Sequence, residues 1–403
     1  MILGTVPVFS ALPAWFVVLE RRFGWSRAEL SLAFSFARVE GSIMGPVAGH
    51  LIDKLGPRRM VLIGFPILGV GFLLFSQMHN LWQFYLAFVV MSSGGGFGTW
   101  LPMMTVLNNW FRRRRAMAMG IAMEGFAIGG VLLVPALAWA IDPDHFGPDR
   151  WRTVAAGIGV ALIVLAFPIS RMVRNRPEDY GLLPDGRPPA STPAVTGSAP
   201  PASQQEGYTW QQALRTRAFW LITIGHSCSS IVIVTITVHL GPMLDDRGFS
   251  LQTVGWVVST YTGVGGIFML VGGYIGDRLP MRMTLFIFSA IQSVAVVILL
   301  QADSLEVVYL FAVVMGVGFG GRAPLSTAIR GIYFGRRAFA SITGISMIPM
   351  NFLLLAAPLF AGIMFDATGS YQVPFLTIAV VSFVGAVAFL LLGEPPKLDP
   401  DNA

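Results

Sequence analysis

The sequence GHLIDKLGPRR at residues 49–59 is a charged segment in a chain that is otherwise strongly apolar. A near-copy, GYIGDRLPMR, occupies residues 273–282. Three pairs of residues recur at the same spacing of 224 positions: Gly49 and Gly273, Asp53 and Asp277, and Arg58 and Arg282. A repeat on this scale indicates that the chain consists of two related halves.

The composition indicates a membrane protein. Hydrophobic residues make up 54% of the 403 positions and charged residues only 12%, whereas about 25% of the residues of a soluble domain are charged. Apolar stretches near 20 residues recur, and each is long enough as a helix to cross the roughly 30 Å hydrocarbon core of a bilayer. The twelve stretches are residues 1–19, 28–52, 60–78, 81–107, 116–141, 153–170, 218–244, 254–276, 283–301, 305–329, 338–364 and 373–392. We predict an all-α membrane protein with 12 transmembrane helices in two pseudo-symmetric six-helix bundles.

The basic residues predict the orientation. With both termini in the cytoplasm, 19 of the 27 Lys and Arg residues lie in inner loops or the tail, and six lie in outer loops. This asymmetry follows the positive-inside rule. The inner set includes Arg330, Arg336 and Arg337, which we assign to the loop after the tenth stretch. Because the basic residues are scattered among short loops, we expect no nucleic-acid partner despite the net charge of +6. We expect a bacterial-type inner (plasma) membrane.

The first apolar stretch begins at Met1 with nothing before it. Its repeat partner begins near Ala218, and the same spacing puts the expected start about six residues before Met1. We therefore expect that the true start lies upstream. A cleaved signal peptide is the alternative, but the stretch has no basic region before it and is longer than the apolar region of a usual signal.

The repeat predicts three parts. Residues 1–170 are expected to form the N-terminal bundle and residues 218–403 the C-terminal bundle with a short cytoplasmic tail. Residues 171–217 are expected to form a cytoplasmic linker, because their Pro, Ser, Ala and Gly content buries little apolar surface. Within the linker, residues 208–217 (YTWQQALRTR) are expected to form a short helix at the membrane interface.

The charged segment carries a family resemblance. It fits G-x-x-x-D-[RK]-x-G-x-[RK]-[RK] and, with two six-span halves and a long middle loop, resembles the major facilitator superfamily. The matching residues are Gly49, Asp53, Lys54, Gly56, Arg58 and Arg59, and the second copy has Pro280 in place of the second glycine. Four phrases are similar to the monocarboxylate and oxalate–formate antiporter branch: FGWSRAELSLAFSF (23–36), RNRPEDYGLLPDG (174–186), VHLGPMLDDRGFS (238–250) and FDATGSY (365–371). The resemblance implies transport by alternating access, with a substrate site where the two halves meet.

The resemblance also implies that the motif holds an outward-open state. From the residues alone, Asp53 ends the second span and Gly56-Pro57 supplies a turn. Gly45 and Gly49, with Gly41, form a ridge of small residues that allows another helix to approach closely. We predict a gating role for both copies of the motif. The alternative is a topology anchor with a tight turn.

Two arginines, Arg38 and Arg322, lie inside predicted spans. Charges inside a membrane are costly and therefore suggest function, and the planar guanidinium matches a carboxylate. We predict that both bind substrate. In the relatives the recognition arginine is on the eighth span, where this chain has no basic residue, so Arg38 on the symmetry-related second span is its expected replacement. The alternative is a structural ion pair with Glu40, Glu124 or a helix end. Small residues and Pro324 around Arg322 predict a loosened helix beside a cavity.

Two further residues could carry protons. Glu124 lies in the fifth span among glycines, and a carboxyl group away from water can hold a proton near neutral pH. His226 lies in the seventh span and is of a type that titrates near neutrality. A structural ion pair for Glu124 and an ordinary hydrogen bond for His226 are the alternatives.

Motifs for catalysis, metals and cofactors are absent from the sequence, so an enzyme is not expected. The glycine runs at 94–98 and 316–321 are interpreted as sites of helix packing. The leading prediction is a secondary transporter of a small organic anion such as a monocarboxylate, proton-coupled or exchanging. An exporter of amphipathic drugs or metabolites is the alternative, and a membrane receptor, sensor or membrane enzyme is a third possibility. The expected partners are the organic anion, the lipid bilayer and coupling protons.

Overall fold

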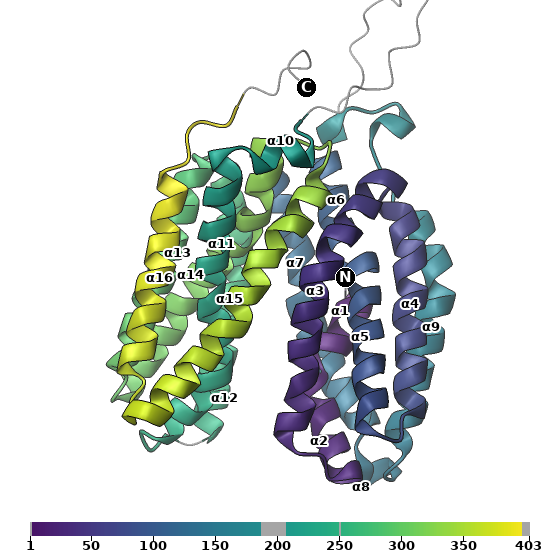
Figure 1. Ribbon diagram of the computed structural model, residues 1–403, viewed down its shortest axis with the longest axis vertical. Coiled ribbons are helices and arrows are strands. Elements are labelled where there is room, and N and C mark those ends of the chain that lie inside the picture. Colours follow the sequence, from purple (N-terminus) through teal and green to yellow (C-terminus); the bar gives the residue numbers. More distant parts are fainter. Residues whose placement is uncertain (1, 187–206, 250, 397–403) are drawn as a thin grey trace, which may run out of the picture. The chain divides into compact units, whose positions relative to one another are not determined.

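The computed structural model describes residues 2–186, 207–249 and 251–396 (Figure 1). Within these ranges every regular element is a helix. The part of the predicted linker at 187–206 lies outside the described residues. The all-α fold class is confirmed.

The chain divides into two compact units. The first comprises residues 1–112, 122–206 and 336–348, and the second comprises residues 113–121, 207–335 and 349–403. Each unit therefore takes a short segment from the other half of the repeat. The division at residues 170 and 217 remains a prediction.

The first unit is built around helices from the N-terminal half. They are α1 (Ile2–Thr5), η1 (Val6–Ser10), α2 (Leu12–Phe23), α3 (Arg27–Leu55), α4 (Pro57–Gln77), α5 (Leu81–Gly98), α6 (Trp100–Trp110), most of α7 (Arg115–Ala140), α8 (Pro143–Phe146) and α9 (Arg150–Met172). The first predicted span is interrupted by η1, a π-helical turn that contains Pro7, which lacks the N–H of a regular helical ladder. The fourth is interrupted at Thr99, whose φ of −116° and ψ of −90° are not helical.

The second unit contains the later helices. They are α10 (Trp210–Leu214), α11 (Arg217–Asp245), α12 (Leu251–Gly276), α13 (Met281–Leu300), α14 (Leu305–Phe334), most of α15 (Phe339–Thr368) and α16 (Gln372–Leu390). α10 confirms the short helix predicted in residues 208–217. Thr209 and Gln212 form a capping box at its start, in which each side chain satisfies a backbone N–H of the other residue.

Nine helical segments of the described chain are long and apolar enough to cross a membrane. They are Pro57–Gln77, Leu81–Trp110, Arg150–Met172, Arg217–Leu244, Thr253–Gly276, Met281–Leu300, Leu305–Phe334, Phe339–Thr368 and Gln372–Leu390. Large apolar side chains are exposed on these helices, including Leu86, Val164 and Ile267. Such surfaces suit lipid rather than water.

Each unit has its own apolar core. In the first unit Trp15, Phe75, Phe84 and Trp151 are buried together, and the Trp15 and Phe75 rings pack edge to face at 5.3 Å. In the second unit the core includes Phe311 and Phe375. Because each unit buries aromatic side chains within itself, each has the interior of a separate folding unit.

Local sequence signals explain where α3 begins and ends. Ser26 and Glu29 form a capping box at its first turn, with the Glu29 N–H donating to Ser26 Oγ at 3.2 Å. α3 ends at Gly56, whose φ of +84° favours glycine, and Pro57 then begins α4. The predicted Gly56-Pro57 turn is confirmed.

The glycine run at 94–98 brings α5 against α4. A Cβ added at Gly94 would lie 2.7 Å from Leu68 Cα, whereas one at Gly96 would meet no atom within 4 Å. The two helices pack side by side in Figure 1. The interpretation as a helix-packing run is therefore confirmed for Gly94 but not for Gly96.

We expect Gly94→Val to destabilise the protein by about 1–3 kcal/mol, because the larger side chain must displace the α4 backbone. Gly96→Val is the matched control and should unfold within a degree or two of the wild type. Thermal unfolding of the detergent-purified proteins measures both. Equal melting temperatures for the two variants would contradict this account of the α4–α5 crossing.

Candidate functional site

The second unit contains a buried group of basic side chains on α11 and α14. Arg322, in α14, is only 2% exposed. Its Nε donates to Gln292 Oε1 at 3.0 Å, and its Nη1 donates to Ser326 Oγ at 3.2 Å. Gln292 is itself held by a hydrogen bond from its Nε2 to the Ser229 carbonyl on α11, at 3.0 Å. The Arg322 guanidinium is therefore fixed by neutral partners from two helices.

Arg330 extends this group toward α11. It is 3% exposed, and its Nη1 donates to the Ser326 carbonyl at 2.7 Å. Its Nη2 lies 3.1 Å from His226 Nδ1. Because an arginine nitrogen can only donate, His226 Nδ1 is the acceptor and carries no proton in this arrangement. We call Arg322, Arg330, His226, Gln292 and Ser326 the basic cluster.

The assignment of Arg330 to a loop was wrong. α14 continues to Phe334, so Arg330 lies inside the helix and is buried. Arg322, Ser326 and Arg330 follow one another at intervals of four residues, which puts them on one face of the helix. This spacing could have identified Arg330 and Ser326 from the sequence, but the apolar stretch was ended at residue 329. Nothing local in the sequence points to Gln292.

The basic cluster contains no acid. No hydrogen bond or ion pair joins either guanidinium to a carboxylate among the described residues. An arginine carries five N–H donors, and the Nη2 group of Arg322 makes no hydrogen bond to the described part of the chain. A buried charge is stabilised only when it is paired and fully hydrogen-bonded. The cluster is therefore suited to an anionic ligand.

The surroundings of Arg322 differ from the prediction in one respect. Pro324 was expected to loosen the helix beside a cavity, but α14 is helical without a break from Leu305 to Phe334. The glycines before Arg322 are used for packing. A Cβ at Gly320 would lie 2.7 Å from Gly265 Cα, and one at Gly321 would lie 2.6 Å from Phe288 Cγ. The small residues thus let α12 and α13 approach α14.

Arg38 and Glu124 lie in the first unit. Arg38 is half-buried in α3, and its side chain makes no hydrogen bond or ion pair with the described residues. Its suggested partner Glu40 instead accepts a hydrogen bond from Ser93 Oγ at 2.6 Å. The Oε1 atom of Glu124 is buried and has no hydrogen-bond partner among the described residues.

The predicted site residues thus fall into two groups. Arg322 and His226 belong to one cluster, joined through Arg330 and Ser326. Arg38 and Glu124 belong to the other unit, and no hydrogen bond or ion pair joins them to each other. Within the described residues no group of three or more His, Cys, Asp and Glu side chains could hold a metal ion.

The first copy of the motif caps a helix. Asp53 Oδ1 accepts from the Ala340 N–H at 3.2 Å, and Oδ2 accepts from the Ser341 N–H at 2.8 Å. These N–H groups belong to the first turn of α15, which has no intrahelical acceptors for them. The carboxylate also faces the positive end of the helix dipole.

The second copy repeats this geometry. Asp277 Oδ1 and Oδ2 accept from the N–H groups of Ala116 and Met117, each at 2.9 Å, in the first turn of α7. Ala340 and Ser341 follow Ala116 and Met117 by the same 224 positions that separate the two aspartates. The repeat seen in the sequence therefore extends to the hydrogen bonds. Asp53 caps α15 and Asp277 caps α7, and these two helices occupy equivalent positions in the two halves of the repeat.

The motif glycines make these caps possible. A Cβ at Gly49 would lie 2.8 Å from Ser341 Cα, and a Cβ at Gly273 would lie 2.9 Å from Met117 Cα. Farther along α3, a Cβ at Gly45 would lie 3.1 Å from the Gly344 carbonyl oxygen. The predicted close approach of another helix to this ridge is confirmed for Gly45 and Gly49.

The two motif arginines have different surroundings. The backbone N–H of Arg58 donates to Asn175 Oδ1 at 2.8 Å, which ties the start of α4 to the segment after α9. Arg282 Nη1 donates to the Leu392 carbonyl at 2.9 Å, just past the end of α16. The repeat is therefore strict for the aspartate caps and looser for the arginines.

A polar cavity of about 270 Å³ adjoins the Asp53 cap. Asp53, Lys54, Arg176, Arg336 and Arg337 supply its charged lining together with Asp179. Arg336, one of these lining residues, pairs through Nη1 with Glu178 Oε1 at 2.8 Å and donates to the Asn109 carbonyl at 3.1 Å. The described start of the linker, including η2 (Glu178–Tyr180) and η3 (Pro184–Gly186), is thus fastened to the first unit.

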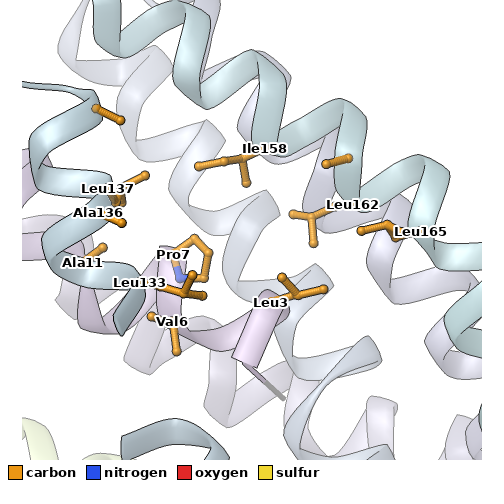
Figure 2. A pocket seen from close by; sticks show the side chains of 12 residues that line it. Leu3, Val6, Pro7, Ala11, Leu133, Ala136, Leu137, Ile158, Leu162 and Leu165 are labelled. Carbon is orange, nitrogen blue, oxygen red and sulfur yellow. The ribbon is translucent and has the colours of Figure 1, made fainter. Parts of the chain in front are cut away.

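A second cavity, of about 300 Å³, is lined by apolar side chains among the described residues (Figure 2). Figure 2 shows side chains from α1 and η1, including Leu3 and Val6, opposite Leu133 of α7 and Leu162 of α9. Among the side chains that the structure describes, none that is charged or carries a hydroxyl group lines it. A small anion would lose its hydration there without any replacement, so this cavity is not an anion site.

These features define a polytopic membrane protein built from two related helical units. A family model described as the Major Facilitator Superfamily matches residues 2–253 and 224–403. The chain therefore belongs to the major facilitator superfamily, and the resemblance stated from the motif is confirmed.

The chain has named relatives. It is 27% identical over 395 residues to monocarboxylate transporter 13 of Rattus norvegicus, covering 96% of this chain and 83% of that one. It is 24% identical over 408 residues to the probable L-galactonate transporter of Escherichia coli (strain K12), covering 97% and 86%. The solved structure of the E. coli fucose:proton symporter has a TM-score of 0.69 and 12% identity, covering 96% and 97%. The relatives are consistent with the monocarboxylate branch, and they are transporters, not enzymes.

We expect Asp53→Asn and Asp277→Asn to lower stability by similar amounts, about 1–3 kcal/mol each. The amide retains one acceptor oxygen and directs an NH₂ group at the second backbone N–H, so one hydrogen bond and the charge are lost. Thermal unfolding in detergent measures the change. Asp303→Asn, in the loop before α14, is the control and should unfold like the wild type. A large effect of one motif variant and none of the other would contradict the equivalence of the two caps.

Proposed function

We propose that this transporter carries a small organic anion of the monocarboxylate type, and that Arg322 binds its carboxylate. The observation that carries the proposal is a fixed, buried guanidinium with neutral partners and an unused Nη2 group. Two parallel N–H donors match the two oxygens of a carboxylate. An anion would also compensate a charge for which the described residues supply no acid.

The relatives support an acidic substrate. The names monocarboxylate transporter and probable L-galactonate transporter both refer to carboxylates. At 24–27% identity they support the substrate class and not a particular acid.

We propose Arg38 as a second anion-binding group. Its guanidinium lies half-buried in α3, and Glu40, the nearest acid in sequence, is engaged by Ser93. A charge within a spanning helix without an ion pair suggests a ligand rather than a structural role.

We further propose that transport is coupled to protons, with Glu124 and His226 as carriers. The Glu124 Oε1 atom has no hydrogen-bond donor among the described residues, so protonation of this carboxyl would break no bond there. His226 Nδ1 holds a lone pair that already accepts a hydrogen bond. The fucose:proton symporter with the same fold is named for such coupling.

For the transport cycle we propose alternating access, with the two aspartate caps as gates. Asp53 and Asp277 hold the first turns of α15 and α7, the two helices whose residues are divided between the units. Gly49 and Gly273 permit the close approach at these ends of α3 and α12, and Arg58 and Arg282 donate hydrogen bonds from the first turns of the next helices, α4 and α13. Breaking and remaking a cap would then accompany each change of state.

From the distribution of basic residues we also propose that both termini are cytoplasmic and that the protein lies in a plasma membrane, with residues 171–217 as a cytoplasmic linker. The exporter of amphipathic compounds remains the second candidate, because the apolar cavity of about 300 Å³ could accept a lipophilic group.

The test of the anion site is uptake by proteoliposomes. With Arg322→Gln we expect initial uptake of the transported acid to fall roughly 10- to 100-fold, since a charge-assisted hydrogen-bonded pair is lost. Arg38→Gln is tested in parallel. Arg247→Gln is the matched control, because within the described part of the chain this arginine donates to the Leu299 and Leu300 carbonyls and to no residue of the cluster. Wild-type uptake by both Arg322→Gln and Arg38→Gln would refute the proposal.

The two candidate functions make different predictions in a substrate screen. Radiolabelled lactate, pyruvate, oxalate and formate are offered under an inward proton gradient, and an amphipathic cation such as ethidium is offered to inverted vesicles. For the anion carrier we expect accumulation of at least one acid and no ethidium transport. Ethidium transport without acid uptake would favour the exporter.

A further inference from the structure

We infer that Arg330 links proton uptake by His226 to anion binding in the basic cluster. The inference rests on the proposed function, because it assigns a role within the same site. It concerns a residue that is neither a predicted ligand nor part of the repeated motif. Arg330 is expected to donate to His226 when the imidazole is neutral and to the substrate carboxylate when the imidazole is protonated.

Three hydrogen bonds join four residues in series. Arg322 Nη1 donates to Ser326 Oγ, Arg330 Nη1 donates to the carbonyl of the same Ser326, and Arg330 Nη2 donates to His226 Nδ1. Arg322 and Arg330 are about 12 Å apart along the helix axis, but their side chains converge on the serine between them. A ligand bound at Arg322 would therefore lie near the Arg330 guanidinium.

The His226 contact excludes protonation at the same nitrogen. The lone pair on Nδ1 either accepts the Arg330 N–H or holds a proton. When Nδ1 takes a proton delivered by hydronium, which is left as water, an N–H bond forms there and the hydrogen bond from Arg330 breaks, while no proton leaves the guanidinium. Arg330 Nη2 then needs another acceptor, and a carboxylate at the cluster supplies one.

The charge balance favours the same coupling. The charged groups that face His226 are Arg330 and Arg322, both from α14. α10, α12 and α16 also pack against α11 and contain no charged residue. The sole charged residue of α13 is Arg282, which donates to the Leu392 carbonyl, and the Tyr333 hydroxyl of α14 donates to the Gly393 carbonyl. α14 also carries Glu306, which is exposed in its first turn, and α15, which contacts α11 through His239 and Pro358, carries the exposed Asp366. Neither acid is among the charged groups that face His226, so the anion compensates a third positive charge there.

Proton and anion should consequently bind together. We expect the apparent KM of the wild type for its acid to rise between pH 6 and pH 8 by up to about tenfold per pH unit, as linkage requires when one proton accompanies one anion. His226→Gln keeps an acceptor for Arg330 but takes up no proton. Arg330→Gln replaces the guanidinium that donates to the imidazole with a shorter, neutral amide, while Arg322 remains.

The experiment measures KM at pH 6, 7 and 8 in proteoliposomes, using whichever of lactate, pyruvate, oxalate and formate is taken up, together with proton influx reported by an internal pH dye. In both variants we expect anion exchange to remain measurable, KM to change less than about twofold across the range, and proton influx to be lost. Arg247→Gln should keep the wild-type profile. Thermal unfolding of each variant controls for a purely structural defect.

The outcomes separate this inference from the proposed function. If Arg322→Gln abolishes uptake but both His226→Gln and Arg330→Gln keep the wild-type pH profile and proton influx, the coupling through Arg330 is wrong and the anion site stands. If none of the four acids is taken up, or if Arg322→Gln transports normally, the anion site fails and the inference fails with it.

Discussion

A charge in the interior of a membrane protein has to be compensated, and the second unit is arranged around this constraint. Arg322 and Arg330 lie on one face of α14, and their partners are an amide, a serine and an imidazole, all neutral. Glycines at positions 320 and 321 let α12 and α13 approach closely enough to seal this region. The helix packing that buries the guanidiniums thus also leaves them, among the described residues, with neutral hydrogen-bond partners alone.

The repeated motif also satisfies polar groups that the helices alone leave without partners, here backbone N–H groups. The first turns of α15 and α7 have N–H groups without intrahelical acceptors, and in a low-dielectric setting these must be satisfied from elsewhere. Asp53 and Asp277 do so with both carboxylate oxygens, at distances that Gly49 and Gly273 permit. Pro280 changes the turn after the second copy but not the cap, because the aspartate and glycine that form the cap precede it.

Much of the fold and part of the site could be predicted from the sequence. The aspartates and glycines of the motif were identified because a repeat and a four-residue spacing are both visible along the chain. Arg330 was missed because the apolar stretch was judged to end just before it, and hydropathy does not distinguish a buried arginine from one in a loop. Glu40 was considered as a partner for Arg38, yet its oxygen accepts from Ser93 of α5, and no property of α3 alone could have revealed this.

The sequence by itself determined that the chain is a membrane protein of two related helical halves, because hydropathy, periodicity and repetition depend only on the order of the residues. Only the tertiary structure decided that the repeat continues into reciprocal hydrogen bonds, and that Arg322, Arg330 and His226 form one cluster. The aspartate caps and the Arg330–His226 contact join residues that are separated by 104 to 288 positions in the chain. Their geometry depends on how closely the helices pack, which small and large side chains from several helices set together.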